Sequence, residues 1–92
     1  MIKIIGNDIT RNGEKIGWIE ENDIYNEDGK KLGYYSDESV FNSEGHKVGY
    51  IKGNDIKTMD GYSFDLDDNK EEITGGSFSD IVRAAVKLLI GD

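Results

Sequence analysis

Hydrophobic and polar residues alternate along most of the first two thirds of the chain, in short runs separated by turns that contain glycine. Alternation with a period of two is typical of a β-strand with one buried face, and two such runs around a tight turn indicate a β-hairpin. The glycines recur every 16 residues in two series, so the pattern predicts a repeated hairpin. The series are Gly13, Gly29, Gly45 and Gly61 in the turns, and Gly17, Gly33 and Gly49 within second strands.

The turns themselves predict how the strands pair. Residues 26–30 and 42–45 have the composition of a type I turn followed by a left-handed glycine, and residues 58–61 resemble them. Residues 11–14 contain Asn-Gly, the signal for a two-residue type I′ turn. Counting outward from each turn gives one register for all four hairpins. The expected opposite pairs are Ile9 with Ile16, Ile24 with Leu32, Val40 with Val48, and Ile56 with Phe64.

That register sorts the side chains into two faces of the sheet, because successive side chains of a strand point to opposite sides. The buried face takes these aliphatic pairs, and it also takes the larger residues Trp18, Tyr34, Tyr50 and Leu66. The other face takes Tyr25, Tyr35 and Phe41 together with the mid-strand glycines. Glycine inside a strand usually marks a bend or a close approach, so three at one phase predict a tightly coiled sheet.

The two ends of the chain complete a single domain over residues 1–92 in this interpretation. Residues 1–4 are in phase with a second strand, so we expect them to pair with the last hairpin and to close the ring within residues 1–66. Residues 67–76 form an acidic connector, of which 73–76 are either one more short strand or part of the link.

The period changes to helical over residues 77–91. Ser77 followed three residues later by Asp80 resembles a capping box, and Gly91 stands where a helix ends. The polar residues form one narrow stripe, so the apolar surface is too broad for a helix that rests on one flat surface. We expect the hairpins or a second chain to cover it. The apolar residues available for such contacts are Ile81, Val82, Val86, Leu88 and Leu89.

The predicted fold is mainly β: four antiparallel hairpin repeats in a pseudo-four-fold, closed or nearly closed small barrel or flower, plus one C-terminal α-helix. Composition then narrows the function classes. The chain of 92 residues has no cysteine and a net charge of -8. A chain without disulfides suits a reducing cytoplasm, and the acidic excess with scattered basic residues argues against nucleic-acid binding. No apolar run is long enough for a membrane span.

Residues 24–35, their neighbours 40–51 and the closing residues 56–61 resemble the prokaryotic four-fold beta-flower proteins. The resemblance covers about residues 5–66 and rests on the spacing and on the four copies. It implies a small pseudo-four-fold β structure of hairpins, and it implies no activity, cofactor or catalytic residue. The fourth unit departs from the pattern, because Asp65 takes the phase of the mid-strand glycine.

The apolar C-terminal helix is not part of that repeat pattern. It gives the chain a weaker likeness to tubby-like barrels, whose hairpins surround an apolar C-terminal helix. Eight short strands are few for enclosing a helix, so we expect the helix to plug one mouth of the ring.

Candidate chemistry is sparse. His46 is the only histidine and lies beside a predicted turn, and no nucleophile or phosphate-binding motif is present, so we predict no catalytic residue and no cofactor. The register places Asp55 opposite Asp65, with Asp67 two residues along on the same face. Three converging carboxylates are a candidate site for a hard cation such as calcium, although the spacing is not that of an EF-hand, and a solvated end of the sheet is the alternative.

The aromatic residues of the second face are the other candidate. Exposed rings at Tyr25, Tyr35 and Phe41 are suited to stacking on sugars or to holding a quaternary ammonium group. We therefore carry two hypotheses. The first is a non-enzymatic interaction module that binds a protein partner or itself through the C-terminal helix, and the alternative is a glycan or small-ligand binding domain that uses these rings.

Overall fold

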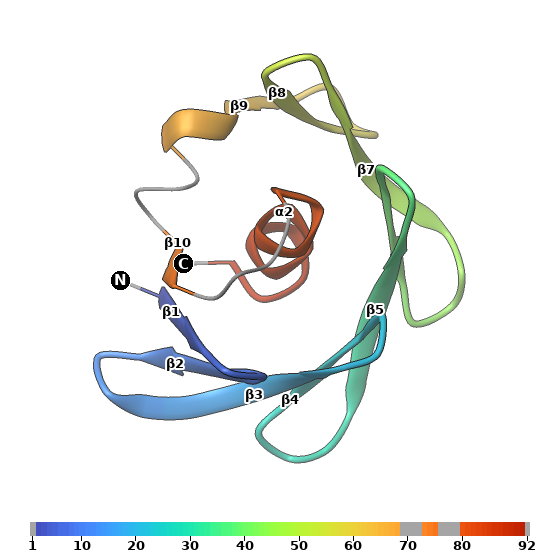
Figure 1. Ribbon diagram of the computed structural model, residues 1–92. Helices are drawn as coiled ribbons and strands as arrows, with labels where there is room; N and C mark the ends of the chain where they lie inside the picture. Colours follow the sequence, from blue (N-terminus) through green and yellow to red (C-terminus); the bar gives the residue numbers. More distant parts are fainter. Residues whose placement is uncertain (1, 69–72, 76–79, 92) are drawn as a thin grey trace.

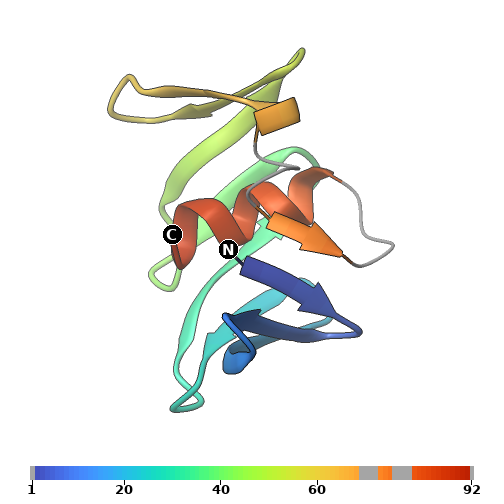
Figure 2. The same ribbon diagram turned by 90° about the vertical axis from the view of Figure 1, so that its left-hand side faces the viewer.

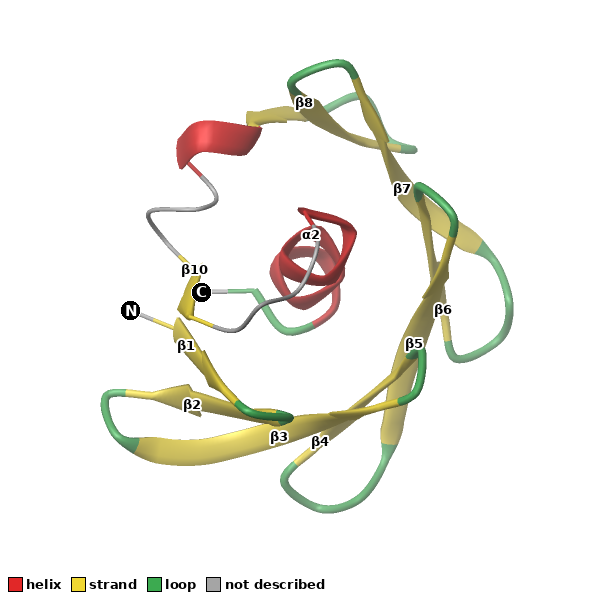
Figure 3. Ribbon diagram, in the orientation of Figure 1, coloured by secondary structure: helices red, strands yellow, loops and turns green. Residues whose placement is uncertain are grey.

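The computed structural model describes residues 2–68, 73–75 and 80–91. Ten strands form one sheet, in which β1 to β9 follow one another in chain order and β10 is added beside β1 (Figure 1, Figure 3). Neighbouring strands from β1 to β9 are antiparallel, whereas β10 is parallel to β1. The strands are β1 (Ile2–Ile5), β2 (Asp8–Arg11), β3 (Glu14–Glu20), β4 (Asp23–Asn26), β5 (Lys31–Ser36), β6 (Ser39–Asn42), β7 (Lys47–Lys52), β8 (Asp55–Thr58), β9 (Ser63–Asp65) and β10 (Ile73–Gly75).

The sheet curls around the helix α2 (Asp80–Leu89), which contacts β4, β5, β6 and β7. Figure 1 looks along the helix and shows it at the centre of the curl, and Figure 2 shows it from the side. The prediction that the helix plugs one mouth of the ring is therefore wrong, because the helix occupies the interior. An open curl of ten strands is wider than the closed ring of eight that the prediction assumed.

The sheet is not closed. Residues 1–4 were expected to pair with the last hairpin, but β1 pairs with β2 on one side and with β10 on the other. Within the described residues, β9 and β10 are the two edges of the sheet and do not pair with each other. The reason is that β10, inside the predicted connector, takes the edge of β1 that closure would have used. Helical residues 66–68 follow β9 directly.

The predicted turns are confirmed. Asn12 and Gly13 both have positive φ (53° and 87°) between the paired residues Arg11 and Glu14, as a type I′ turn requires. In the next hairpin, Gly29 N–H donates to Asn26 O at 3.1 Å and Gly29 has φ 82°. The turns at Gly45 and Gly61 repeat this geometry.

The predicted register is wrong in the first three hairpins and correct in the last. Ile24 lies opposite Gly33 rather than Leu32, while Tyr25 lies opposite Lys31. One residue of β5 is therefore extra, which is a β-bulge. The same shift occurs between β2 and β3 and between β6 and β7. In the last hairpin, Ile56 does face Phe64 and the ladder is regular.

Each bulge exchanges the two faces for the rest of its strand. Ile19, Tyr35 and Ile51 therefore lie on the inner face, opposite Ile24, Val40 and Ile56 of the following strands. The rings expected in the core lie on the outer face instead; these are Trp18, Tyr34 and Tyr50. Counting alternate residues outward from each turn gave the wrong register, because a bulge adds one residue to a strand and leaves the hydrophobic pattern on either side unchanged.

The mid-strand glycines have a steric explanation. A Cβ on Gly33 would collide with the backbone oxygen of Phe41 and would stand 2.8 Å from a methyl group of Leu89. A Cβ on Gly49 would stand 2.5 Å from a methyl group of Leu88. Glycine therefore lets the neighbouring strand and the helix approach the inner face, which confirms the prediction of a close approach.

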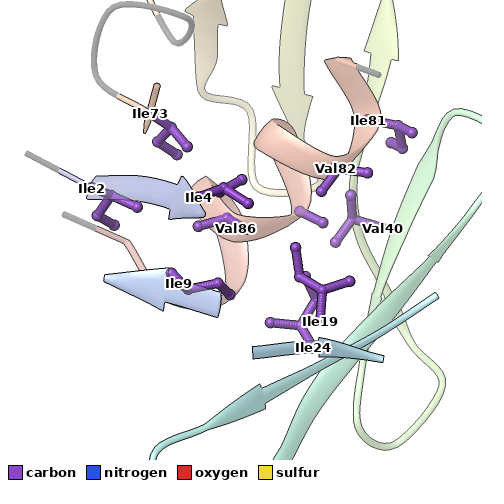
Figure 4. Packing of buried hydrophobic residues seen from close by; sticks show 11 residues of the cluster. Ile2, Ile4, Ile9, Ile19, Ile24, Val40, Ile73, Ile81, Val82 and Val86 are labelled. Atoms are coloured by element: carbon purple, nitrogen blue, oxygen red, sulfur yellow. The ribbon is translucent and has the colours of Figure 1, made fainter. Parts of the chain in front are cut away.

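The core lies between the helix and the inner face of the sheet (Figure 4). Its fully buried aliphatic residues come from the N-terminal strands, the later hairpins, β10 and the helix. They include Ile2, Ile4, Ile9, Ile24, Val40, Ile73 and Val86, and a smaller cluster joins Ile56, Leu66 and Ala84. At its C-terminal end, the helix is capped by Gly91 (φ 76°), whose carbonyl oxygen accepts a hydrogen bond from Arg11 at 3.1 Å. The predicted capping residue Ser77 lies outside the described residues.

Candidate functional site

Three rows of side chains cross the outer face of the sheet, one for each bulged hairpin. In row one, the Lys15 ammonium lies 5.2 Å from the Trp18 ring centre, and Trp18 stacks on Tyr25 at 5.4 Å and 17°. In row two, Lys31 lies 5.1 Å from the Tyr34 ring, which stacks on Phe41 at 5.0 Å and 16°. Row three consists of Lys47, Tyr50 and Lys57, with the Lys47 ammonium 4.6 Å from the Tyr50 ring.

The charges of the rows differ. Lys15 pairs with Asp8 and Lys31 pairs with Asp23, each at 3.1 Å. Asp8 and Asp23 lie opposite Trp18 and Tyr34 in the ladder. In row three, the corresponding residue opposite Tyr50 is Ser39. Within the described residues, neither lysine of row three forms an ion pair. Row three is therefore cationic, whereas the other two rows are neutral.

The three rings predicted as a ligand site are not brought together. Tyr25 and Phe41 lie on the outer face, but in different rows and stacked on other rings. Tyr35 lies on the inner face, where its hydroxyl donates to Glu21 O at 3.3 Å and burial raises its pKa above 10.0. These three rings therefore do not form the aromatic cage that a quaternary ammonium group requires.

The predicted carboxylates also separate in their roles. Asp55 faces Asp65 across the last hairpin, as the register predicted. The Asp65 carboxylate accepts a hydrogen bond from Asp67 N–H at 2.8 Å and a longer one from Asp68 N–H at 3.4 Å. Asp65 therefore satisfies the backbone donors at the start of helical residues 66–68. No group of three metal-ligating side chains is present in the part of the chain that the structure describes.

The helix residues predicted as an interaction surface are covered by the chain itself. Ile81, Val82 and Val86 are buried in the core. Leu88 and Leu89 are half-buried and lie against the glycines of β7 and β5. The surface that the sequence offered to a second chain is thus occupied by the protein's own sheet.

Exposed apolar side chains gather instead on the last hairpin. Among the described residues, the large hydrophobic side chains with the greatest exposure are Met59 (58%), Tyr62 (66%) and Phe64 (37%), with Ile5 (59%) on β1. We call the first three the last-hairpin surface: Phe64 is in β9, Tyr62 directly precedes β9, and Met59 is in the turn, where its N–H donates to Val48 O of β7 at 3.1 Å. The outer edge of β9 has no partner strand among the described residues. Figure 2 shows this hairpin extending away from the helix. A sheet edge beside exposed apolar side chains is suited to pairing with another chain.

The surface depressions that described residues line do not bring together a catalytic constellation. The largest that we describe, about 410 Å³, lies at the N-terminal end of the helix between Asp37, Asn54, Leu66 and Asp80. A second of about 340 Å³ borders row three and is lined by Lys47, Val48, Met59 and Asp60. His46 is exposed beside Glu44 and lines neither of them.

The outer rows were missed by sequence reasoning, although a signal for them exists. In each bulged hairpin an aliphatic residue directly precedes the mid-strand glycine, as at Leu32 and Gly33. A regular strand would place these two on opposite faces, but at the bulges in β3 and β7 the aliphatic residues Ile16 and Val48 still pack against the core. Reading that pair as a bulge would have placed Tyr34 on the outer face.

Comparison with protein families identifies the fold. The model of the 4-fold beta flower protein family matches residues 4–65, which is more than half of the chain. Searches among curated proteins and among solved structures find no match. No helix in the described residues is long and apolar enough to cross a membrane. The chain belongs to the 4-fold beta flower protein family.

Proposed function

We propose that this beta-flower protein is a non-enzymatic interaction module that self-associates through its last-hairpin surface. The observation that carries the proposal is that the exposed Tyr62 and Phe64 lie beside and on β9, whose outer edge has no partner strand among the described residues, while Met59 is exposed in the turn of the same hairpin. Exposed apolar patches and free sheet edges are both costly for a chain that remains alone, and one contact between two copies would cover both.

The position of the helix supports this choice of surface. The sequence predicted assembly through the helix, because the apolar surface of the helix is broader than one flat surface covers. The curled sheet covers that surface, so the helix stabilises the domain rather than a contact between domains. The last hairpin remains as the place where large apolar side chains face solvent.

The geometry of β9 favours a symmetric dimer. If two β9 strands pair antiparallel about Phe64, Ser63 of one copy faces Asp65 of the other, so no like charges are opposed. Each copy then contributes the same surface, which is how two-fold dimers are built. The contact also continues the sheet from one chain into the next.

Net charge sets the conditions for this contact. Each chain carries a net charge of -8, so two copies repel each other at low ionic strength. Salt screens that repulsion and leaves the apolar contact and the backbone hydrogen bonds in place. We therefore expect self-association to strengthen as sodium chloride increases.

Analytical ultracentrifugation across micromolar to millimolar protein, at low and high salt, tests the proposal. The wild type should form a dimer whose fraction increases with concentration and with salt. Tyr62→Lys should abolish the dimer, whereas Ile5→Lys, a control at an equally exposed apolar position on β1, should not. A wild type that remains monomeric throughout, or equal losses in both variants, would overturn the proposal.

The proposal also includes the finer description of the fold, that the four hairpins are diverged copies of one unit around a pseudo-four-fold axis. It is supported by a recurring hydrogen bond from the end of each hairpin to the preceding turn. These bonds join Ile19 N to Asn7 O, Tyr35 N to Asn22 O, Ile51 N to Glu38 O and Leu66 N to Asn54 O. We assign the module to the cytoplasm, where a chain without cysteine loses no disulfide to reduction.

A further inference from the structure

We infer that row three, formed by Lys47, Tyr50 and Lys57, binds a planar ring that carries an oxyanion such as a phosphate. This site lies on the outer face of the sheet and goes beyond the proposed self-association, which uses the edge of β9. It retains the idea of a ring-binding face that the sequence suggested and locates it on other residues.

Row three lacks the second ring that rows one and two have. In rows one and two, the residue opposite the central ring is itself aromatic, and the two rings stack. In row three, the residue opposite Tyr50 is Lys57. The contact that Phe41 makes with Tyr34, at 5.0 Å and 16°, therefore has no counterpart on Tyr50. A flat ligand ring can make that contact once the flexible Lys57 side chain moves aside.

The charge around that position also differs from the charge in the other two rows. Lys47 has Ser39 where the lysines of the other rows have an aspartate, and Lys57 adds a second ammonium across the strand pair. Two lysine ammonium groups and a phenol hydroxyl in the same row offer several donors to one oxyanion. The missing ring and the missing aspartate coincide in the same row, so a single ligand can satisfy both.

The neighbouring acids define the ligand class further. Asp55 and Asp65 occupy the adjacent cross-strand pair on the same face, and Asp60 lines the depression beside Lys47. Together with the net charge of -8, they repel a polyanion such as a nucleic acid. A ring with one oxyanion suits the row better, because stacking supplies part of the affinity. The depression of about 340 Å³ next to Lys47 gives room for a substituent at that end.

The experiment is a titration of the full-length protein with phenyl phosphate, followed by amide chemical shifts in NMR. Shifts should centre on residues 47, 50 and 57. Inorganic phosphate lacks the ring and phenol lacks the oxyanion, and each should bind at least about fivefold more weakly than phenyl phosphate. For phosphate, this factor corresponds to the loss of stacking, which contributes about 1 kcal/mol. Equal affinity for phosphate and phenyl phosphate would overturn the role of Tyr50. Shifts spread evenly over all three rows would show an adventitious ion only and would overturn the site.

Variants test the missing ring and the missing aspartate separately. Lys57→Phe supplies the missing ring from the chain and should abolish binding, and Ser39→Asp should weaken it by pairing with Lys47. Lys57→Gln removes the charge without filling the space and should weaken binding while leaving phenol unaffected. The matched control is Asp23→Ser, which frees Lys31 in row two but keeps Phe41 on the ring, and it should gain no affinity for phenyl phosphate. Unchanged binding in Lys57→Phe, with the amide spectrum otherwise intact, would overturn the inference.

Discussion

The first three hairpins and the last hairpin share their turn geometry but differ in how their second strands continue. In the first three, a bulge precedes a glycine, and the strand then carries a ring on the outer face. In the last, Phe64 stands opposite Ile56 where the others have glycine, and the ladder has no bulge. The inner faces of the three bulged hairpins thus contribute to the core around the helix, and their outer faces carry the three rows of rings and lysines. The last one ends early, at Asp65.

The comparison shows what one glycine decides. Where it is present, the neighbouring backbone or the helix comes close to the strand, as at Gly33. Where it is absent, the Phe64 ring stays at the border of the sheet, with the Lys87 ammonium 5.3 Å from its centre. The three bulged hairpins therefore build most of the core, and the last hairpin, which has no bulge, leaves the apolar surface and the free edge on which the proposed function rests.

The largest expected effect comes from removing the glycine of a bulged hairpin. Gly33→Ala forces a Cβ against the Phe41 carbonyl oxygen and Leu89, and we expect it to lower the free energy of unfolding by about 3 kcal/mol. Urea denaturation measures the loss. Phe64→Ala, at the corresponding position of the last hairpin, should cost much less, since Phe64 is partly exposed. A Gly33→Ala protein as stable as the wild type would contradict the steric explanation.

The next effect distinguishes the helix from the last hairpin. Val86→Ala removes two methyl groups from a fully buried site and should cost about 2 kcal/mol. Tyr62→Ala, at an exposed site, should change the stability of the monomer by less than about 0.5 kcal/mol. Thermal and urea unfolding at low protein concentration measure both. If Tyr62→Ala proved as costly as Val86→Ala, the last hairpin would be core and the contrast would fail.

A smaller, stabilising effect is expected from completing row three. Lys57→Phe should place a ring on Tyr50 as Phe41 lies on Tyr34, and we expect it to raise the free energy of unfolding by about 0.5 to 1 kcal/mol. The reverse change in row two, Phe41→Lys, should lower it by a similar amount. Urea denaturation of both variants tests whether the rows are equivalent, and a destabilised Lys57→Phe would show that they are not.

The smallest effect is a pH dependence at Tyr35, whose place in the last hairpin is taken by Leu66. Burial raises the pKa of Tyr35 in the folded protein above 10.0, so its contribution is fully present below pH 10 and is lost as pH rises through the folded pKa. Stability above pH 10 should therefore fall less steeply in Tyr35→Phe than in the wild type. At pH 7 the variant should lose only the hydrogen bond to Glu21 O, about 0.5 kcal/mol. Urea denaturation of the wild type and Tyr35→Phe at a series of pH values measures how steeply each stability falls. Identical slopes above pH 10 would contradict the role of Tyr35.

Much of this molecule follows from local sequence. The residues of the four hairpin turns specified their own geometry, because glycine and asparagine adopt positive φ at low cost, and Asn12, Gly13 and Gly29 are found in that conformation. The strands, the helix and the family were equally readable. The pairing of Asp55 with Asp65 was correct because no bulge intervenes in the last hairpin.

The candidate sites were less predictable, since they depend on which face a side chain occupies. Because of a bulge of one residue, Tyr34 lies on the outer face and Tyr35 on the inner face. The expected ring site is therefore not formed, and the outer rows are present instead. Asp55, Asp65 and Asp67 do not form a metal-binding group among the described residues, and the Asp65 carboxylate binds backbone amides of the following turn.

The sequence by itself thus determined the turns, the strands and the apolar helix, because each depends on residues close together in the chain. The tertiary structure decided where the bulges lie, which edge β10 takes and that the helix lies inside the curl. These features depend on contacts between residues that are distant in the chain, such as Leu89 and Gly33. A local sequence pattern carries no information about whether such residues fit together in three dimensions.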